Sequence, residues 1–157
     1  MKKIIGRWTV NTAALLSLSL LPACSRATLQ PDRDKVEEVM EAMCQAQTGI
    51  SAEEGQAAET STEGRKAAYD KLFIEPIRKS GYDPDKSLQG FASKLINDDC
   101  TPEERGVIEK FLPFYVKWAG DLGNLGLIDR RTAELLEQVQ LGGTRTRTFP
   151  VRPRFQS

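Results

Sequence analysis

Histidine is absent from the 157 residues of the chain. Ser-His and Cys-His nucleophile systems need an imidazole, so its absence excludes both classes of active site, together with metal sites that histidine would ligate. Only three cysteines occur, and none forms the Cys-x-x-Cys pair typical of thioredoxin-like redox sites. No apolar run approaches the roughly 20 residues of a membrane-spanning helix. We therefore predict a protein without a cofactor that acts by binding and not by catalysis.

Charge is distributed unevenly along the chain, although 22 Lys and Arg balance 22 Asp and Glu overall. The first 23 residues carry three cations and no acid, and the residues from Gly142 onward carry four cations and no acid. The stretch between them contains all the acids and has a net charge of −7. Nucleic-acid phosphates require a positive surface, so this acidic stretch argues against a nucleic-acid partner.

Residues 1–23 are organised like an export signal. Three cations come first, residues 13–21 form an apolar centre, and Ala23 is a small residue before a cleavage point. The apolar centre is too short to cross a bilayer. We expect this segment to be removed from the mature protein.

The stretch Leu21-Pro22-Ala23-Cys24 resembles the lipobox of bacterial lipoproteins. The resemblance implies that Cys24 becomes the mature N-terminus, with a diacylglyceryl group on its sulfur and an acyl chain such as palmitate on its amine. Ser25, where an Asp would favour retention, implies sorting to the outer membrane, facing the periplasm. Several acyl chains would make the anchor effectively permanent. The alternative is ordinary signal-peptidase cleavage nearby, with Cys24 left as a free thiol.

Three segments are expected after the signal. Residues 24–31 form a short polar tether that, at no more than about 3.5 Å per residue, holds the domain near the membrane. Residues 32–142 form the helical domain. Residues 143–157 form a basic tail whose alternating Arg, Thr and Pro favour neither helix nor core.

The tail is the candidate for contact with an anionic membrane surface or an acidic partner, because it combines arginines with two phenylalanines. A tail that is simply solvated would explain the same composition. The candidate residues for an anionic surface are Arg145, Arg147, Arg152 and Arg154.

Apolar residues recur at helical spacing in five stretches, which predicts an all-α domain, a small helical bundle of about five helices. Pro76 and Pro113 lie inside two of these and are expected to bend or break them, because proline removes a backbone hydrogen bond. Residues 50–62, polar and small, are expected to form a loop, with one helical turn as the alternative. Residues 120–126, rich in glycine, are expected to form a second loop. The expected helices cover about residues 32–48, 63–79, 85–96, 101–119 and 129–141.

The sharpest helix start is Thr101-Pro102-Glu103-Glu104, which predicts Thr101 as N-cap and Glu104 as its reciprocal partner. Asp85 and Asp129 are the expected N-caps of two other helices. The acids at residues 98–99 and 103–104 could offer oxygen ligands to Ca²⁺, but capping and the helix dipole explain them without an ion. No metal site is predicted.

A disulfide between Cys44 and Cys100 is expected if Cys24 is acylated, because these two then remain as one pair in an oxidising compartment. Cys44 falls eight residues after Val36 on the apolar stripe of the first helix, so we expect it to point inward. The bridge would tie the end of that helix to the start of the fourth. Two separate buried thiols are the alternative.

The fourth expected helix has apolar residues on more than one side. One stripe suffices for packing, and Phe114 and Trp118, four residues apart, add a second surface beside it. Such a helix is either central in its bundle or presents a binding face, so Phe114 and Trp118 are the candidate partner-binding residues.

The predicted function is that of a non-catalytic, membrane-anchored envelope lipoprotein that binds another envelope protein. It would be an accessory subunit of a secretion or envelope machine, or an inhibitor or immunity protein against a toxin. The alternatives are a cell-wall glycoside hydrolase, which would need a cleft with two facing carboxylates, and a periplasmic lipid carrier. The carrier would need a cavity lined by Phe73, Phe91, Phe111 and Tyr115.

Overall fold

The computed structural model describes residues 26–144, with side chains described as far as residue 142. Every regular element in this range is helical, so the prediction of an all-α domain is confirmed. None of the described helices combines the length and the apolar character needed to cross a bilayer. The chain is divided into more helices than the five predicted: α1 (Arg33–Thr48), α2 (Ala52–Thr60), α3 (Thr62–Tyr69), the π-helical turn η1 (Asp70–Ile74), α4 (Glu75–Lys79), α5 (Pro84–Ile96), α6 (Pro102–Phe111), α7 (Pro113–Val116), α8 (Ala119–Asn124) and α9 (Arg130–Thr144).

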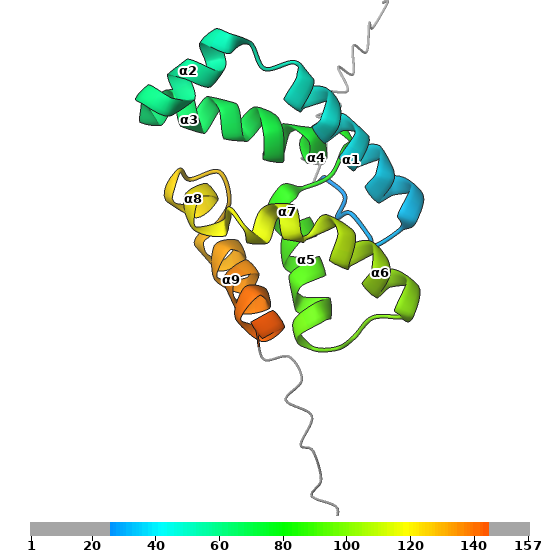
Figure 1. The fold of residues 1–157 in the computed structure, drawn as a ribbon. Helices are drawn as coiled ribbons and strands as arrows, with labels where there is room; N and C mark the ends of the chain where they lie inside the picture. The colour runs from blue at the N-terminus through cyan, green and yellow to red at the C-terminus, as the bar shows by residue number, and fades with distance from the viewer. Residues whose placement is uncertain (1–25, 145–157) are drawn as a thin grey trace, which may run out of the picture.

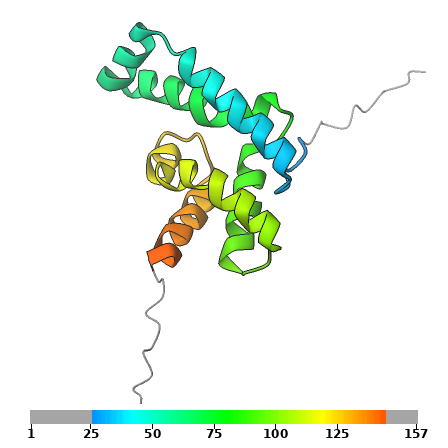
Figure 2. The same ribbon diagram turned by 45° about the vertical axis from the view of Figure 1, so that its right-hand side comes forward.

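The helices form two layers with the core between them (Figure 1). α1 packs along the continuous stretch from η1 to α4, while α5 to α9 lie beneath this layer. One core runs from Leu29 to Leu136, and Phe91, Phe111 and Tyr115 are among its fully buried side chains. The described chain begins on one side of the molecule and ends on the opposite side, as Figures 1 and 2 both show.

Side-chain caps begin α5 and α6, one of them as predicted. The Thr101 hydroxyl accepts from the backbone N–H of Glu104 at 3.2 Å, and the Glu104 carboxylate accepts from the Thr101 N–H at 3.0 Å, which confirms the capping box. The N-cap of α5 is Asp83, not Asp85 as predicted, because Pro84 takes the first helical position that proline favours. The Asp85 carboxylate is thereby free to bond elsewhere.

Both interior prolines interrupt their helices, as predicted. Just before Pro76, the chain forms η1, in which the Glu75 N–H donates to the Asp70 carbonyl five residues back. The second break separates α6 from α7, which begins at Pro113 and lasts four residues. Proline has no backbone N–H and cannot donate a helical hydrogen bond, which accounts for both interruptions.

The expected loop at residues 50–62 is wrong, because α2 occupies most of it. The Ser51 hydroxyl accepts from the Glu54 N–H at 3.2 Å, and the Glu54 carboxylate accepts from the Ser51 N–H at 2.8 Å. This second capping box starts a helix that has no buried residue. Because the segment has no apolar stripe, its sequence predicts a loop and not a helix.

The expected glycine-rich loop at residues 120–126 is also largely helical, as α8. Ala119 and Leu122 are buried, and a Cβ built on Gly123 would lie 3.0 Å from the Cβ of Ala133. Glycine therefore lets α8 approach α9 closely, which outweighs its low helix propensity. α9 itself runs on through Gly142, where it was expected to stop, to Thr144.

Cys44 and Cys100 are both free thiols, so the predicted disulfide is wrong. At 100° per residue, Cys44 lies about 80° around α1 from Val36, at the edge of the apolar stripe, and it is exposed. α6, which follows Cys100, begins beside the first turns of α1, whereas the last turns of α1 lead away from it (Figure 2). Cys100 is partly exposed, so the two buried thiols of the alternative are not found either.

The segment expected to be a polar tether is packed against the domain from residue 27 onward. The carbonyl of Ala27 accepts from the N–H of Asp83 at 2.9 Å, and the N–H of Leu29 donates to the Ser87 hydroxyl at 2.9 Å. The side chain of Leu29 is only 1% exposed and belongs to the core. A single apolar residue in a polar stretch has no periodic pattern, so the sequence does not predict this contact.

Candidate functional site

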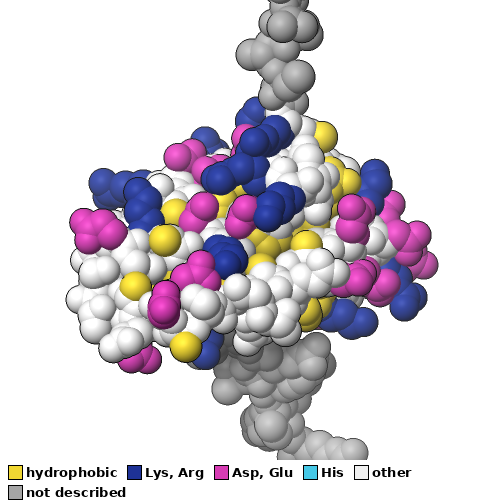
Figure 3. Space-filling view, turned by 90° about the horizontal axis from the view of Figure 1, so that it is seen from above, with side chains coloured by type: hydrophobic (Ala, Val, Ile, Leu, Met, Phe, Trp, Pro, Cys, Tyr) yellow, Lys and Arg dark blue, Asp and Glu magenta, His cyan; other side chains and the backbone are white. Residues whose placement is uncertain are grey.

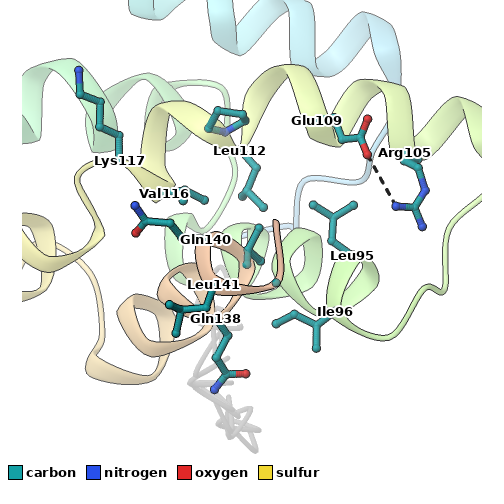
Figure 4. Close-up of a pocket in the computed structure, with 13 residues that line it drawn as sticks. Leu95, Ile96, Arg105, Glu109, Leu112, Val116, Lys117, Gln138, Gln140 and Leu141 are labelled. Carbon is teal, nitrogen blue, oxygen red and sulfur yellow. Dashed lines mark ion pairs between the residues drawn. The ribbon is translucent and has the colours of Figure 1, made fainter. Parts of the chain in front are cut away.

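A groove of about 900 Å³ opens between α5, α6, α7 and the end of α9. Its floor is apolar, and its side chains converge from three directions (Figure 4). Three large apolar side chains are exposed in the described part of the chain, and two of them line the groove. These are Ile96, which is 42% exposed, and Leu141, which is 69% exposed. Exposed apolar side chains gathered in one hollow are typical of an interaction site. The other apolar lining residues are Leu95, Leu112, Pro113, Val116 and Val139.

Charged side chains stand along the α6 and α7 side of the groove. Nη1 of Arg105 lies 3.6 Å from Oε1 of Glu109 (Figure 4). The same guanidinium contacts the carboxylate of Asp98. Lys117 lies further along, with its Nζ 5.2 Å from the ring centre of Trp118. The groove thus combines an apolar floor with a polar rim, the usual composition of a protein-binding surface.

The two predicted partner-binding residues lie apart. Phe114 is 47% exposed, whereas Trp118 is partly buried, with its ring 5.6 Å from Tyr69 and 6.4 Å from Phe73. They do not share a helix face, because α7 ends at Val116 and Trp118 has non-helical angles. Trp118 joins the two layers, and only Phe114, next to Pro113 on the groove, remains an exposed candidate.

The aromatic residues proposed for a carrier cavity pack against one another instead. Ring centres are 5.7 Å apart for Phe91 and Phe111, 5.1 Å for Phe111 and Tyr115, and 6.0 Å for Tyr115 and Phe73. The Tyr115 hydroxyl donates to the Phe73 carbonyl within η1 at 2.8 Å. Burial raises the pKa of Tyr115 far above its usual value, so it stays a neutral donor. The rings therefore fill the space that a lipid would need.

A partly buried polar network fixes the first turn of α9 against the first turns of α5. The Asp85 carboxylate accepts from the Asp129 N–H and from the Thr132 hydroxyl, both at 2.7 Å. The Thr132 hydroxyl, itself fully buried, accepts from the Gln89 amide at 2.9 Å. Asp85 was expected to be an N-cap, but its carboxylate instead joins α5 to α9.

Carboxylates do not face one another across the groove. Glu134 and Glu137 line a separate hollow of about 400 Å³, but both are exposed on one face of α9, and Glu134 pairs with Arg130 at 2.9 Å. Of the acids considered for Ca²⁺, Glu104 accepts from the Lys94 ammonium at 3.1 Å as well as capping α6. Among the described residues, no three His, Cys, Asp or Glu side chains are grouped closely enough to hold a metal ion.

Two sets of predicted site residues lie outside the described part of the chain: the acylation site Cys24, and the tail arginines Arg145, Arg147, Arg152 and Arg154. The groove was not predicted, because Ile96 and Val139 follow the helical spacing of core residues. Compared with known proteins, this chain matches no family model, no curated protein and no solved structure.

Proposed function

We propose that this chain is a membrane-anchored lipoprotein of the bacterial envelope that acts without catalysis, by binding another envelope protein in the groove. The anchoring rests on the lipobox-like stretch that ends at Cys24. The binding role rests on one observation, the apolar groove in which Ile96 and Leu141 are exposed. A partner in the envelope, or a toxin entering it, would find in this groove an apolar floor with exposed Ile96 and Leu141.

The composition of the groove indicates what it binds. Three helices supply an apolar floor, and Arg105, Glu109 and Lys117 supply a rim of both signs. An amphipathic helix with a row of apolar side chains and a polar back would bury its apolar row against the floor. Neither the packed aromatic core nor the exposed carboxylates of α9 gives comparable support to a carrier or a hydrolase.

Photo-crosslinking in the native envelope tests the binding role. A photoreactive residue at Ile96 should give a discrete adduct, while the same residue at Glu59 on α2 should not, since α2 lies outside the groove. Leu141→Gln should weaken the adduct several-fold and leave thermal stability unchanged, because Leu141 is 69% exposed. Gln56→Asp on α2 is the matched surface control. Identical adducts from Ile96 and Glu59 would contradict the proposal.

Mass spectrometry of the mature N-terminus tests the anchoring separately. We expect acyl groups on Cys24, recovery in the outer-membrane fraction, and release into the periplasm on Cys24→Ala. A mature chain that starts at another residue and carries no acyl group would refute the lipoprotein assignment but leave the groove intact.

A further inference from the structure

The chain is fixed to the domain almost immediately after the proposed anchor. Ala27 is bonded to Asp83 and forms an isolated parallel bridge with Tyr82, and Leu29 is buried and bonded to Ser87. Cys24 precedes Ala27 by three residues, which span at most about 10 Å when extended. An acylated Cys24 would therefore hold the Ala27 contact within about that distance of the lipid headgroups.

Cations surround this contact. Arg26 and Lys86 are exposed, and neither has an ion-pair partner among the described residues. Arg78 and Lys79 end α4, and Gly81, at φ +89°, turns the chain back so that Tyr82 meets Ala27. In Figure 3, Lys and Arg side chains lie together with Asp and Glu side chains near the upper end of the described chain.

The carboxylates of the same segments have hydrogen-bond or ion-pair partners within the domain. Asp83 caps α5, Asp85 is bonded into the network with α9, and Glu75 pairs with Lys79 at 2.8 Å. Asp70 lies 3.6 Å from Arg78. Arg26 and Lys86 are thus left to meet an external anion.

We propose that the surface formed by Arg26 and Lys86 beside the Ala27–Tyr82 bridge, here called the anchor surface, faces the bilayer and contacts anionic lipid headgroups. This inference rests on the proposed acylation of Cys24. It assigns membrane contact to the folded domain itself, whereas the composition of the chain favours the C-terminal tail.

The same geometry directs the groove away from the membrane. α5 begins at the anchor surface and ends at Ile96 in the groove, and its 13 residues span about 20 Å. α9 begins beside Asp85 and ends at the groove as well, so the two helices run in the same direction. A partner can therefore occupy the groove without entering the headgroup layer.

Depth-dependent fluorescence quenching tests this orientation. The acylated protein, with Cys44→Ser and Cys100→Ser, would carry a single fluorophore on Ser80→Cys beside the anchor surface or on Gln138→Cys near the end of α9. Each form is placed in phosphatidylglycerol-containing vesicles that include a lipid with a nitroxide on its headgroup. We expect several-fold stronger quenching at Ser80 than at Gln138. Equal quenching, or stronger quenching at Gln138, in vesicle-bound protein would overturn the orientation.

Two further variants separate the tether from the charges. A Gly/Ser insertion of about ten residues between Ser25 and Arg26 should greatly reduce the difference between the probes. Arg26→Gln with Lys86→Gln should lower the quenching at Ser80 to the level found on zwitterionic vesicles, and no change would overturn the headgroup contact. Protein that fails to float with vesicles would refute the acylation itself, a result distinct from bound protein with the wrong orientation.

Discussion

Helices α2 and α6 begin with the same capping box but differ in what they bury. In α2 the box joins Ser51 and Glu54, and in α6 it joins Thr101 and Glu104, with the reciprocal hydrogen bonds formed in both. Yet α2 has no buried residue, whereas α6 places Ile108 and Phe111 in the core. Local hydrogen bonding thus determines where each helix begins, and burial determines how firmly the rest of the protein holds it.

In both α2 and α6, a lysine from another helix also pairs with the capping glutamate. Nζ of Lys71 and Nζ of Lys94 each lie 3.1 Å from the carboxylate of their capping Glu, Glu54 and Glu104 respectively. These ion pairs are partly exposed and contribute little to stability. A helix that relies on them, as α2 does, should open more easily than one held by the core.

The largest effect is expected for Phe111→Ala. Phe111 is fully buried and its ring contacts those of Phe91 and Tyr115, so its loss should lower the free energy of unfolding by about 3–5 kcal/mol. Urea denaturation followed by circular dichroism measures this change. Gln56→Ala in α2 is the control and should change the free energy by less than about 0.5 kcal/mol. Equal effects would break the comparison between the two helices.

The next largest effect concerns the turn between α2 and α3. A Cβ on Gly64 would lie 2.2 Å from the carbonyl oxygen of Ala57, a backbone atom, so Gly64→Ala should force the two helices apart at a cost of about 1–3 kcal/mol. Gly55, within α2, has open space around it. Gly55→Ala should stabilise α2 by up to about 1 kcal/mol, because alanine has the higher helix propensity.

Amide hydrogen exchange in α2 distinguishes these two variants. Protection should fall for Gly64→Ala and rise for Gly55→Ala, while the core helices α5 and α9 should change little in either. A fall in protection throughout the domain on Gly64→Ala would mean that α2 and α3 are held as tightly as the core.

Residue spacing and caps predicted those helices that bury an apolar stripe. The helix class, the box at Thr101, the irregular turn before Pro76 and the break before Pro113 followed from local chemistry that any chain would share. α2 and α8 were missed because one buries nothing and the other forms despite two glycines, for the sake of its contact with Ala133. The local capping box accounts for α2 and the contact with Ala133 accounts for α8, and apolar periodicity reports neither.

The site was less predictable than the fold. Ile96 continues the stripe of Leu88 and Leu95, and the sequence gives no sign that α5 extends past its covering helices at that point. Phe114 and Trp118 were paired because they are four residues apart, a spacing that holds only within one helix. The error on Cys44 also comes from spacing alone, since Cys44 lies about 80° around α1 from Val36, at the edge of the apolar stripe, and is exposed.

Removing the N-cap hydroxyl of Thr101 or of Ser51 should lower the stability by a smaller amount, and the two losses should differ. Thr101→Ala should lower the free energy of unfolding by about 1 kcal/mol, because α6 is part of the cooperative core. Ser51→Ala removes an equivalent hydrogen bond, but the urea midpoint should move much less, and the loss should appear as faster exchange of α2 amides. Thr101→Ser and Ser51→Thr retain the hydroxyl and should restore each property.

The smallest effect is expected from titrating the capping carboxylates. Hydrogen bonds from the Ser51 and Thr101 N–H groups, and then the ion pairs with lysine, hold the pKa of Glu54 and of Glu104 below the usual value. A carboxyl whose pKa is lower in the folded state stabilises that state above its unfolded pKa of about 4.3, and this stabilisation is lost as the pH falls through the folded pKa. Glu104→Gln should therefore reduce the decline in global stability below about pH 4.3. Glu54→Gln should leave that decline nearly unchanged and alter only α2 exchange, because protonation there opens a helix that the core does not hold. Matching pH profiles of the urea midpoint for the two variants would show that the two helices unfold as one unit.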